Sequence, residues 1–197
     1  MRSPEDLNDR LCRAIENVRH NSSDFDLNPE TVLPEGRVLK PAAVLVAVTE
    51  DARLILTKRS SRLKNHAGQI AFAGGRQDDT DRDLIHTATR EAQEEIGLDP
   101  ADVRVLGQLP PHETVTSYTV TPIVAMVPQG LRFIPEPGEV AEVFQVPLDH
   151  ILDPANYFVE GRRWRGQRRY YYTAPYGPYY IWGATARMLR GLAEAWT

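Results

Sequence analysis

The segment from Gly74 to Leu98, with the sequence GGRQDDTDRDLIHTATREAQEEIGL, constrains the fold of this chain more strongly than any other. It begins with two consecutive glycines, passes through polar residues that favour the start of a helix, and continues in a helical pattern. Asp79, Thr80 and Asp81 are the candidate helix caps, and Gly97 is placed to end the helix. The fold must therefore bring a glycine turn directly to an amphipathic helix.

The helix is predicted to bury one face and to present carboxylates on the other. On the acidic side, Glu91, Glu94 and Glu95 follow one another at spacings i, i+3 and i+4. Like charges at i and i+4 destabilise a helix by about 0.2–0.5 kcal/mol, and a divalent cation reverses the sign of that interaction. The apolar residues that form the predicted buried stripe are Ile85, Ala88, Ala92 and Ile96.

Three carboxylates within one helical turn suit a hard divalent cation that keeps part of its water shell. We therefore expect Mg2+ or Mn2+ as the cofactor, held by Glu91, Glu94 and Glu95 and bridging to phosphate oxygens. Arg90 stands four residues before Glu94 and is expected to hold that carboxylate in position. The alternative is a solvated helix face, but the double glycine favours the metal site because glycine lets the backbone approach an anion or a metal closely.

The remaining elements are predicted to mix helices and strands without the regular alternation of a doubly wound sheet. Terminal helices are expected from Ser3 to Val18 and from Gly183 to Thr197, where apolar residues recur at helical spacing. We expect one α/β domain over residues 1–197, with the helix and loop of residues 1–38 packed on it as an extension. The predicted strands are residues 42–48 and 54–57, joined as a hairpin, and residues 103–109, 119–127, 143–146 and 170–173.

Charge and cysteine content limit the partners and the compartment. A formal net charge of −4 argues against binding to nucleic acid or to an anionic membrane. The longest apolar run, from Ala42 to Val48, is far shorter than the roughly 20 residues that a spanning helix needs. Cys12 is the only cysteine, so no internal disulfide can form and a reducing compartment is expected. The sequence therefore predicts a cytoplasmic protein.

The second half of the glycine-helix segment resembles the Nudix box, G-x5-E-x7-R-E-U-x-E-E-x-G-U, where U is aliphatic. Residues 90–98, REAQEEIGL, match the R-E-U-x-E-E-x-G-U half completely. Counted from Gly75, Asp81 stands where the pattern has glutamate, and eight residues rather than seven separate it from Arg90. The departure concerns the carboxylate that braces Arg90 in the family, a task for which Asp81 is expected to serve less well.

The resemblance to Nudix enzymes assigns roles within this segment. It implies that Glu91, Glu94 and Glu95 are metal ligands and that the backbone carbonyl of Gly75 completes the metal shell. It also implies catalytic roles for Arg90, Glu94 and Glu95, with Glu94 sharing a metal or activating water. The implied fold is an α/β/α sandwich with a mixed β-sheet.

A stretch before the glycines resembles the coenzyme A diphosphatases within that family. Residues 54–75 resemble their pattern L-L-T-x-R-S-x-x-L-x-x-H-x-G-Q-x-x-F-P-G-G, with Ile55 at its first leucine and Ala73 in place of the proline. Residues 139–144 and 180–185 resemble the same subfamily, so the resemblance runs from about residue 40 to the C-terminus. It implies hydrolysis of coenzyme A or its acyl derivatives to 3′,5′-ADP and 4′-phosphopantetheine.

The substrate-binding residues that this resemblance suggests are Arg59, Arg62, His66 and Gln69. Guanidinium groups match phosphate oxygens, although both arginines also fit the exposed end of a strand. The histidine is a candidate for contacting substrate or ordering its loop, and metal ligation is disfavoured because no second histidine stands at ligand spacing. The base outside the helix is left open among Glu113, Glu139 and Glu142.

Residues 161–172, GRRWRGQRRYYY, form the most basic segment and are expected to be a hairpin that turns at Gly166. This hairpin is interpreted as solvated, as a contact to a second copy in a homodimer, or as a contact to the 3′-phosphate of coenzyme A. The expected partner is a small nucleotide-like substrate. Two other functions stay open: hydrolysis of another nucleoside diphosphate compound, such as ADP-ribose or a dinucleotide, and a Nudix-fold binding protein without activity.

Overall fold

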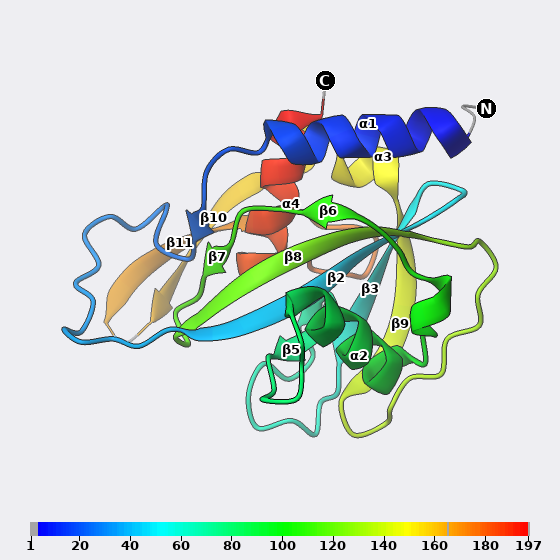
Figure 1. Cartoon of the computed structure of the whole chain (residues 1–197). Coiled ribbons are helices and arrows are strands. Elements are labelled where there is room, and N and C mark those ends of the chain that lie inside the picture. The colour runs from blue at the N-terminus through cyan, green and yellow to red at the C-terminus, as the bar shows by residue number, and fades with distance from the viewer. Residues whose placement is uncertain (1–3, 165, 197) are drawn as a thin grey trace.

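The computed structural model describes residues 4–164 and 166–196 and contains a large mixed β-sheet between helices (Figure 1). Ser3, the predicted first cap, and Thr197, in the predicted last helix, lie outside the described residues. In chain order the elements are α1 (Pro4–Asn17), β1 (Ser22–Ser23), β2 (Lys40–Thr49), β3 (Arg53–Arg59), β4 (Ile70–Ala71), β5 (Ala73–Arg76), α2 (Leu84–Ile96), η1 (Pro100–Asp102), β6 (Arg104–Gln108), β7 (His112–Glu113), β8 (Tyr118–Val127), β9 (Val140–Pro147), α3 (Leu148–Ile151), η2 (Pro154–Asn156), β10 (Phe158–Trp164), β11 (Gln167–Thr173) and α4 (Gly183–Ala195).

A parallel pair of long strands forms the centre of the nine-stranded sheet. β2 pairs with β8 from Lys40 opposite Tyr118 to Thr49 opposite Val127. Both strands are buried along most of their length, and both read as nearly continuous apolar runs, which is typical of strands covered on both faces. The sheet order is β1-β7-β8-β2-β3-β4, with β6 on β8, β5 on β2 and β9 on β3.

The predicted hairpin of residues 42–48 and 54–57 forms, but its strands separate beyond the turn. β2 and β3 pair at Val48 and Leu54, next to the turn. Farther along, β5 pairs with β2 and β4 pairs with β3, both antiparallel. This insertion places the glycines of β5 beside the centre of the sheet, which the linear pattern of strands does not reveal.

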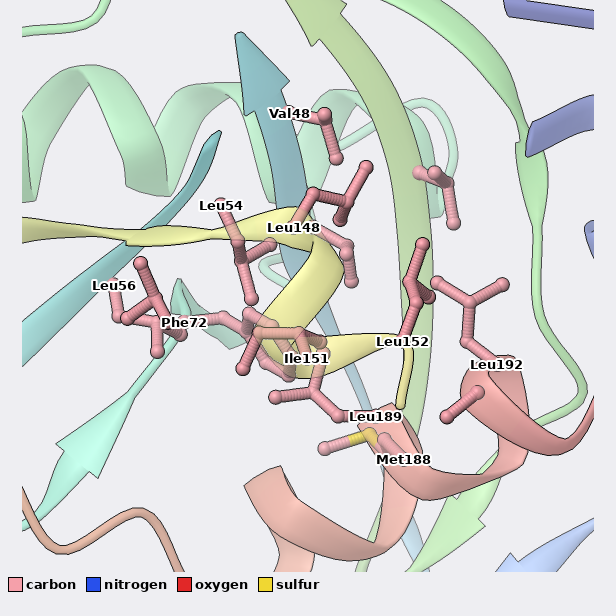
Figure 2. Packing of buried hydrophobic residues seen from close by; sticks show 14 of the residues in the cluster. Val48, Leu54, Leu56, Phe72, Leu148, Ile151, Leu152, Met188, Leu189 and Leu192 are labelled. Atoms are coloured by element: carbon pink, nitrogen blue, oxygen red, sulfur yellow. The ribbon is translucent and has the colours of Figure 1, made fainter. Parts of the chain in front are cut away.

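Helices cover both faces of the sheet, so the predicted α/β/α sandwich with a mixed sheet is confirmed (Figure 1). α2 packs against β2 and β5 on one face, and α1 and α4 lie on the other. Strand side chains alternate between the two cores, since Leu54 and Leu56 belong to the core beneath α4 and Ile55 belongs to the core beneath α2. Figure 2 shows the α4 core, where side chains of β2, β3, α3 and α4 meet.

The N-terminal segment is attached to the sheet through a buried histidine. His112 is fully buried, and its Nδ1 lies 2.9 Å from Ser22 Oγ while its Nε2 lies 3.1 Å from Asp24 Oδ1. Asp24 also accepts a hydrogen bond from Val115 N at 2.9 Å. β1 pairs with β7 in parallel at this point, so the chain that follows α1 is tied to the edge of the sheet.

The start of α2 differs from the prediction. The cap is Asp83, which accepts a hydrogen bond from His86 N at 2.7 Å, and not Asp79, Thr80 or Asp81. Because the helix begins later, the buried stripe also shifts: Leu84 packs against the core four residues before Ala88, whereas Ile85 is 37% exposed. The predicted end is confirmed, because Gly97 has a φ of 70° and closes the helix.

The hairpin of residues 161–172 is confirmed as the antiparallel pair β10–β11, which forms a separate two-stranded sheet. The remaining predicted strands correspond to β6, β8 and β9, each shifted by a few residues at its ends. In the part of the chain that the structure describes, none of the helices has the length and apolar character needed to span a bilayer.

Gly74 should be sensitive to any side chain. Its φ is 154°, and a Cβ at this position would lie 2.4 Å from the backbone oxygen of Ala43 on β2. Since the two strands are paired there, we expect Gly74→Ala to lower the free energy of unfolding by about 2–4 kcal/mol, measured by urea denaturation. Gly36→Ala is the control, because Gly36 has a φ of 68° but open space around its Cβ position. Equal losses in the two variants would contradict the steric explanation.

Candidate active site

The glycine strand β5 passes directly under α2 and leaves room for two of its carboxylates. A Cβ on Gly75 would lie 2.6 Å from Glu91 Cδ and Oε1, so any side chain there would displace the Glu91 carboxylate from the strand. The backbone N–H of Gly74 donates a hydrogen bond to Glu95 Oε2 at 3.1 Å. The two glycines therefore hold the helix carboxylates against the backbone of the sheet, as the sequence indicated for a close approach.

Glu95 is buried, which argues against the alternative of a solvated acidic helix face. Glu95 is only 4% exposed, because its side chain points toward β5. The pKa of the Glu95 carboxyl is raised to about 7: burial is the largest cause and the nearby Glu91 and Glu139 carboxylates add to it, while the Gly74 N–H and Arg59 act in the opposite direction. Burial also raises the pKa of Glu91, against the lowering effect of Arg90. At both carboxyls the effect of burial therefore outweighs that of the neighbouring arginine.

Arg90 connects the helix carboxylates to the loop that precedes the helix. Its Nε and Nη2 donate to Asp81 at 2.9 and 3.0 Å, and its Nη2 also lies 3.0 Å from Glu91 Oε1. Its Nη1 donates to Glu94 at 3.0 Å, which confirms the predicted i, i+4 pair. The guanidinium holds the pKa of Asp81 well below its usual range, and Asp81 in turn raises the pKa of Arg90.

Asp81 braces Arg90 fully, contrary to the expectation that the shorter side chain would do so less well. Its side chain has no exposed surface, and it also accepts hydrogen bonds from Asp78 N and Thr87 Oγ1, both at 3.0 Å, and contacts His86 Nδ1 at 2.8 Å. Asp81 therefore contacts Arg90 through both carboxylate oxygens across the eight residues that separate them.

Of the three predicted metal ligands on α2, the structure brings two together. Glu91 and Glu95 flank the glycine strand, whereas the side chain of Glu94 is 59% exposed and pairs with Arg90. In residues 4–164 and 166–196, no three His, Cys, Asp or Glu side chains are gathered closely enough to hold a metal ion. The donor set still suits a hard divalent cation, because two electron-rich carboxylates and the backbone at Gly75 meet in one place.

The four predicted substrate-binding residues do not all reach this place. Arg59 does, with Nη1 3.8 Å from Glu95 Oε1 and with a buried Nε that has no partner among the described residues. His66 and Gln69 lie on the following loop and contact each other at 3.0 Å, and that loop is held by Arg59 N, which donates to Gln69 O at 2.9 Å. Arg62 is exposed, and the structure gives its side chain no contact with the carboxylates.

The structure places the three candidates for the general base, Glu113, Glu139 and Glu142, in different surroundings. Glu139 lies near the site, since its charge raises the pKa of both Glu91 and Glu95. Glu113 instead pairs with Arg37, and Glu142 accepts the Tyr179 hydroxyl at 2.5 Å.

The approach of Glu139 depends on how the loop between β8 and β9 folds. Ile134 N donates to Ile96 O and Glu136 N donates to Glu95 O, both at 2.9 Å, which attaches this loop to the end of α2. Glu139 N in turn donates to the Glu136 carboxylate at 2.8 Å. Because these are backbone contacts between distant segments, no local sequence signal marks Glu139 out from the other two glutamates.

Comparisons with known proteins agree on one family. A family model described as "NUDIX domain" matches residues 39–165, more than half of the chain. A Citrobacter koseri protein named "Uncharacterized Nudix hydrolase NudL" is 44% identical over 173 residues, which cover 87% of this chain and 90% of that protein. A Pectobacterium atrosepticum protein of the same name is 43% identical over 156 residues, 78% of this chain and 81% of that protein. The crystal structure of a MutT protein from Methanosarcina mazei aligns with a TM-score of 0.49 and 23% identity, over 60% of this chain and 84% of that one.

The raised pKa of Glu95 should make the stability of the metal-free protein depend on pH. An acid with a higher pKa in the folded state stabilises the fold when protonated, so its contribution is complete below the unfolded value of 4.5 and is lost as the pH rises through about 7. Glu95→Gln keeps an acceptor for the Gly74 N–H and has no charge to bury. In EDTA at about pH 8 we expect this variant to be about 1–3 kcal/mol more stable than the wild type, with a smaller difference near pH 5.

Denaturant unfolding of both proteins across this pH range measures the effect. Glu16→Gln is the control, because it removes an exposed carboxylate on α1, on the other face of the sheet, and should leave the pH profile of the wild type unchanged. Parallel profiles for the wild type and Glu95→Gln would contradict the raised pKa.

Proposed function

The chain belongs to the Nudix family, and on that premise we propose that it hydrolyses the diphosphate bond of coenzyme A or of its acyl derivatives. Nudix hydrolases act on pyrophosphate bonds, so the chain is a hydrolase of a nucleoside diphosphate-linked compound. The observation that carries the proposal is the pair of carboxylates, Glu91 and Glu95, held against Gly74 and Gly75 next to the guanidinium of Arg59. A diphosphate bound there would lie between the guanidinium of Arg59 and the carboxylates that are proposed to hold a divalent cation.

Enzymes of this family need divalent metal ions, and in this chain we assign Mg2+ or Mn2+ to Glu91, Glu95 and the backbone carbonyl of Gly75. A bound divalent ion neutralises charge on phosphate oxygens and lowers the pKa of water. Glu94 is exposed and is assigned a weaker role, sharing a metal or orienting water, while Arg90 fixes the positions of Glu91 and Glu94. These assignments rest on the chemistry of the donors and on their arrangement around the glycines.

Glu139 is the best supported general base outside α2. Among the three candidates it is the one whose charge acts on Glu91 and Glu95, so a water bound between these carboxylates lies within its electrostatic reach. Glu113 and Glu142 are engaged elsewhere, by Arg37 and Tyr179. A general base must lie within hydrogen-bond reach of the proton that it takes, directly or through one water.

The coenzyme A assignment rests on the stretch of residues 54–75 and on the position of its arginine. Arg59 ends β3 beside Glu95, and its buried Nε has no partner among the described residues, so the guanidinium is free to turn a donor toward a phosphate. His66 and Gln69 lie on the loop that is hydrogen-bonded to Arg59, and they are proposed to contact the same substrate. Arg62, which is exposed, is proposed as a further contact to its phosphates.

The rival functions are less well supported. Hydrolysis of ADP-ribose or a dinucleotide needs the same carboxylates and differs in the groups that contact the rest of the substrate. An inactive binding protein is disfavoured because Glu91 and Glu95 are both present and both held at the glycine strand. A homodimer stays a prediction, as does the cytoplasmic location that the single cysteine suggests.

The metal assignment predicts that Glu91→Gln and Glu95→Gln keep their fold and lose nearly all hydrolysis. Removing a ligand carboxylate weakens the hold on the cation, and we expect kcat to fall by more than about 100-fold. Turnover of coenzyme A at saturating magnesium measures the loss, and circular dichroism checks the fold. Glu16→Gln, which removes an exposed carboxylate on α1, is the control and should leave kcat unchanged. Near wild-type turnover in either site variant would overturn the metal assignment.

The substrate assignment predicts an order of efficiencies. Coenzyme A should have the highest kcat/KM, dephospho-coenzyme A should be lower, and ADP-ribose lower still. The 3′-phosphate can accept charge-assisted hydrogen bonds, each of which contributes about 1.5–3 kcal/mol, so its loss should lower kcat/KM by about one to two orders of magnitude. Kinetics on the three compounds under one metal condition decides between the candidates. Equal efficiency on coenzyme A and ADP-ribose would contradict the substrate and leave the diphosphate hydrolase in place.

A further inference from the structure

A cavity of about 360 Å³ lies beside the end of β3, on the opposite side of the sheet from the carboxylates. Lys58 stands two residues after Leu56 of the α4 core and lines the cavity, whereas Arg59, which follows a register irregularity in the pairing of β3 with β9, reaches Glu95 beneath α2. Ile70, which also lines it, belongs to the core on the α4 side. The other lining residues come from the loop after β3, from β10 and from the segment before α4: Ala67, Gly68, Gln69, Arg162, Pro178, Tyr179, Tyr180 and Trp182.

The aromatic side of this cavity is held in place by specific contacts. The Tyr179 hydroxyl donates to Glu142 Oε1 at 2.5 Å, and its ring stacks on Phe144 with centroids 3.5 Å apart. The Tyr180 hydroxyl donates to Glu160 Oε2 at 2.7 Å. Trp182 packs edge-on against another tyrosine ring with centroids 5.0 Å apart. Rings fixed in this way present a preformed surface to a planar ligand, which lowers the entropy lost on binding.

The charged side of the cavity carries two cations without local partners. In the described part of the chain, neither Lys58 nor Arg162 forms an ion pair or a side-chain hydrogen bond. The carboxylates that face them are Glu142, opposite Lys58 on β9, and Glu160, two residues before Arg162 on β10. Each of these carboxylates accepts a tyrosine hydroxyl, and among the described residues neither forms an ion pair with Lys58 or Arg162, so the two cations are available to an incoming anion.

We propose that this cavity, called here the aromatic cavity, binds the purine ring and a phosphate of an adenine nucleotide. Tyr180 and Trp182 provide the surface for the ring, and Lys58 and Arg162 provide the charges for the phosphate. The size suits such a ligand, since small-molecule sites commonly enclose about 300–1,000 Å³. Stacking of a base on an aromatic ring contributes about 1–3 kcal/mol by itself and does not depend on a particular hydrogen-bond pattern.

The nucleotide can come from the substrate or from a separate molecule. The first source rests on the proposed function: the loop of Gly68 and Gln69 borders the cavity and is hydrogen-bonded to Arg59 on both of its backbone groups, at 3.1 and 2.9 Å. A substrate with its diphosphate at Glu95 would pass around this loop to reach Tyr180 and Trp182. The second source is a free nucleotide that binds without being cleaved. The chemistry of recognition is the same in both cases.

Calorimetric titration of the full chain with 3′,5′-ADP tests the site without requiring hydrolysis. Arg162→Gln should weaken binding by about 10- to 100-fold, because it removes a charge-assisted contact to phosphate. Arg163→Gln is the matched control: it makes the same change of charge at the next residue of β10, which faces the other side of the strand and does not line the cavity. Inorganic phosphate should bind the wild type at least about ten-fold more weakly than 3′,5′-ADP, since it cannot stack.

Lys58→Gln and Tyr180→Ala provide independent variants, each checked by thermal unfolding, and both should weaken 3′,5′-ADP binding by about ten-fold or more. An unchanged dissociation constant in Arg162→Gln and Lys58→Gln would overturn the proposal, as would equal affinity for 3′,5′-ADP and inorganic phosphate. Equal losses in Arg162→Gln and Arg163→Gln would also overturn it, because general electrostatics would then explain both.

Kinetics separates the two sources of the nucleotide. If the substrate itself occupies the aromatic cavity, Arg162→Gln raises KM for coenzyme A by about ten-fold or more and leaves kcat nearly unchanged, while Arg163→Gln changes neither. If a separate nucleotide binds, 3′,5′-ADP binding falls in Arg162→Gln while KM for coenzyme A stays constant. Failure of the proposed function has a different signature: the wild type then cleaves no coenzyme A, and the titration still reports on the aromatic cavity.

Discussion

The contact between the buried carboxylate of Glu95 and the backbone of Gly74 is the interaction on which the site depends. Ionising a carboxylate that is 4% exposed costs several kcal/mol unless partners offset the loss of water. The Gly74 N–H and the guanidinium of Arg59 offset it only in part, because the pKa stays raised to about 7. The same contact needs β5 to run beside β2 and to carry no side chains. The electrostatics of the site therefore depend on both the sheet topology and the glycines of β5.

Arg90 and Asp81 provide the rigid part of the same region. Their two hydrogen bonds are charge-assisted and bidentate, which is the strongest common geometry for such a pair. Asp81 is buried with further donors around it, so the guanidinium has one stable position from which to contact Glu91 and Glu94. The helix thus contains one carboxylate, Glu91, shared between a fixed cation and the glycine strand. Glu95 has no contact with that cation: its nearest guanidinium is that of Arg59 at 3.8 Å, and burial raises its pKa to about 7.

The sequence predicts those parts of the fold and site that depend on local spacing. The carboxylate pattern, the glycines and the end of α2 at Gly97 could all be recognised, because each is encoded within one segment. The start of α2 was missed because three acidic residues compete as caps and only tertiary contacts direct Asp81 to Arg90. Glu139 could not be ranked above its alternatives, since a loop attached to α2 through backbone hydrogen bonds decides its position. Long-range backbone contacts leave no periodic signal in a sequence.

The end of β3 contributes residues to both faces of the sheet, one to the aromatic cavity and one to the carboxylate site. Lys58 lines the aromatic cavity, while Arg59, across a register irregularity in β3, reaches Glu95. The loop that follows is hydrogen-bonded to Arg59 through Gly68 and Gln69, and both of these residues also border the cavity. A ligand that orders this loop from the cavity side therefore restricts the backbone that carries Arg59. In the complex proposed above, a substrate that contacts both faces would order this loop and, through the two backbone hydrogen bonds, the residue that is proposed to contact its phosphates.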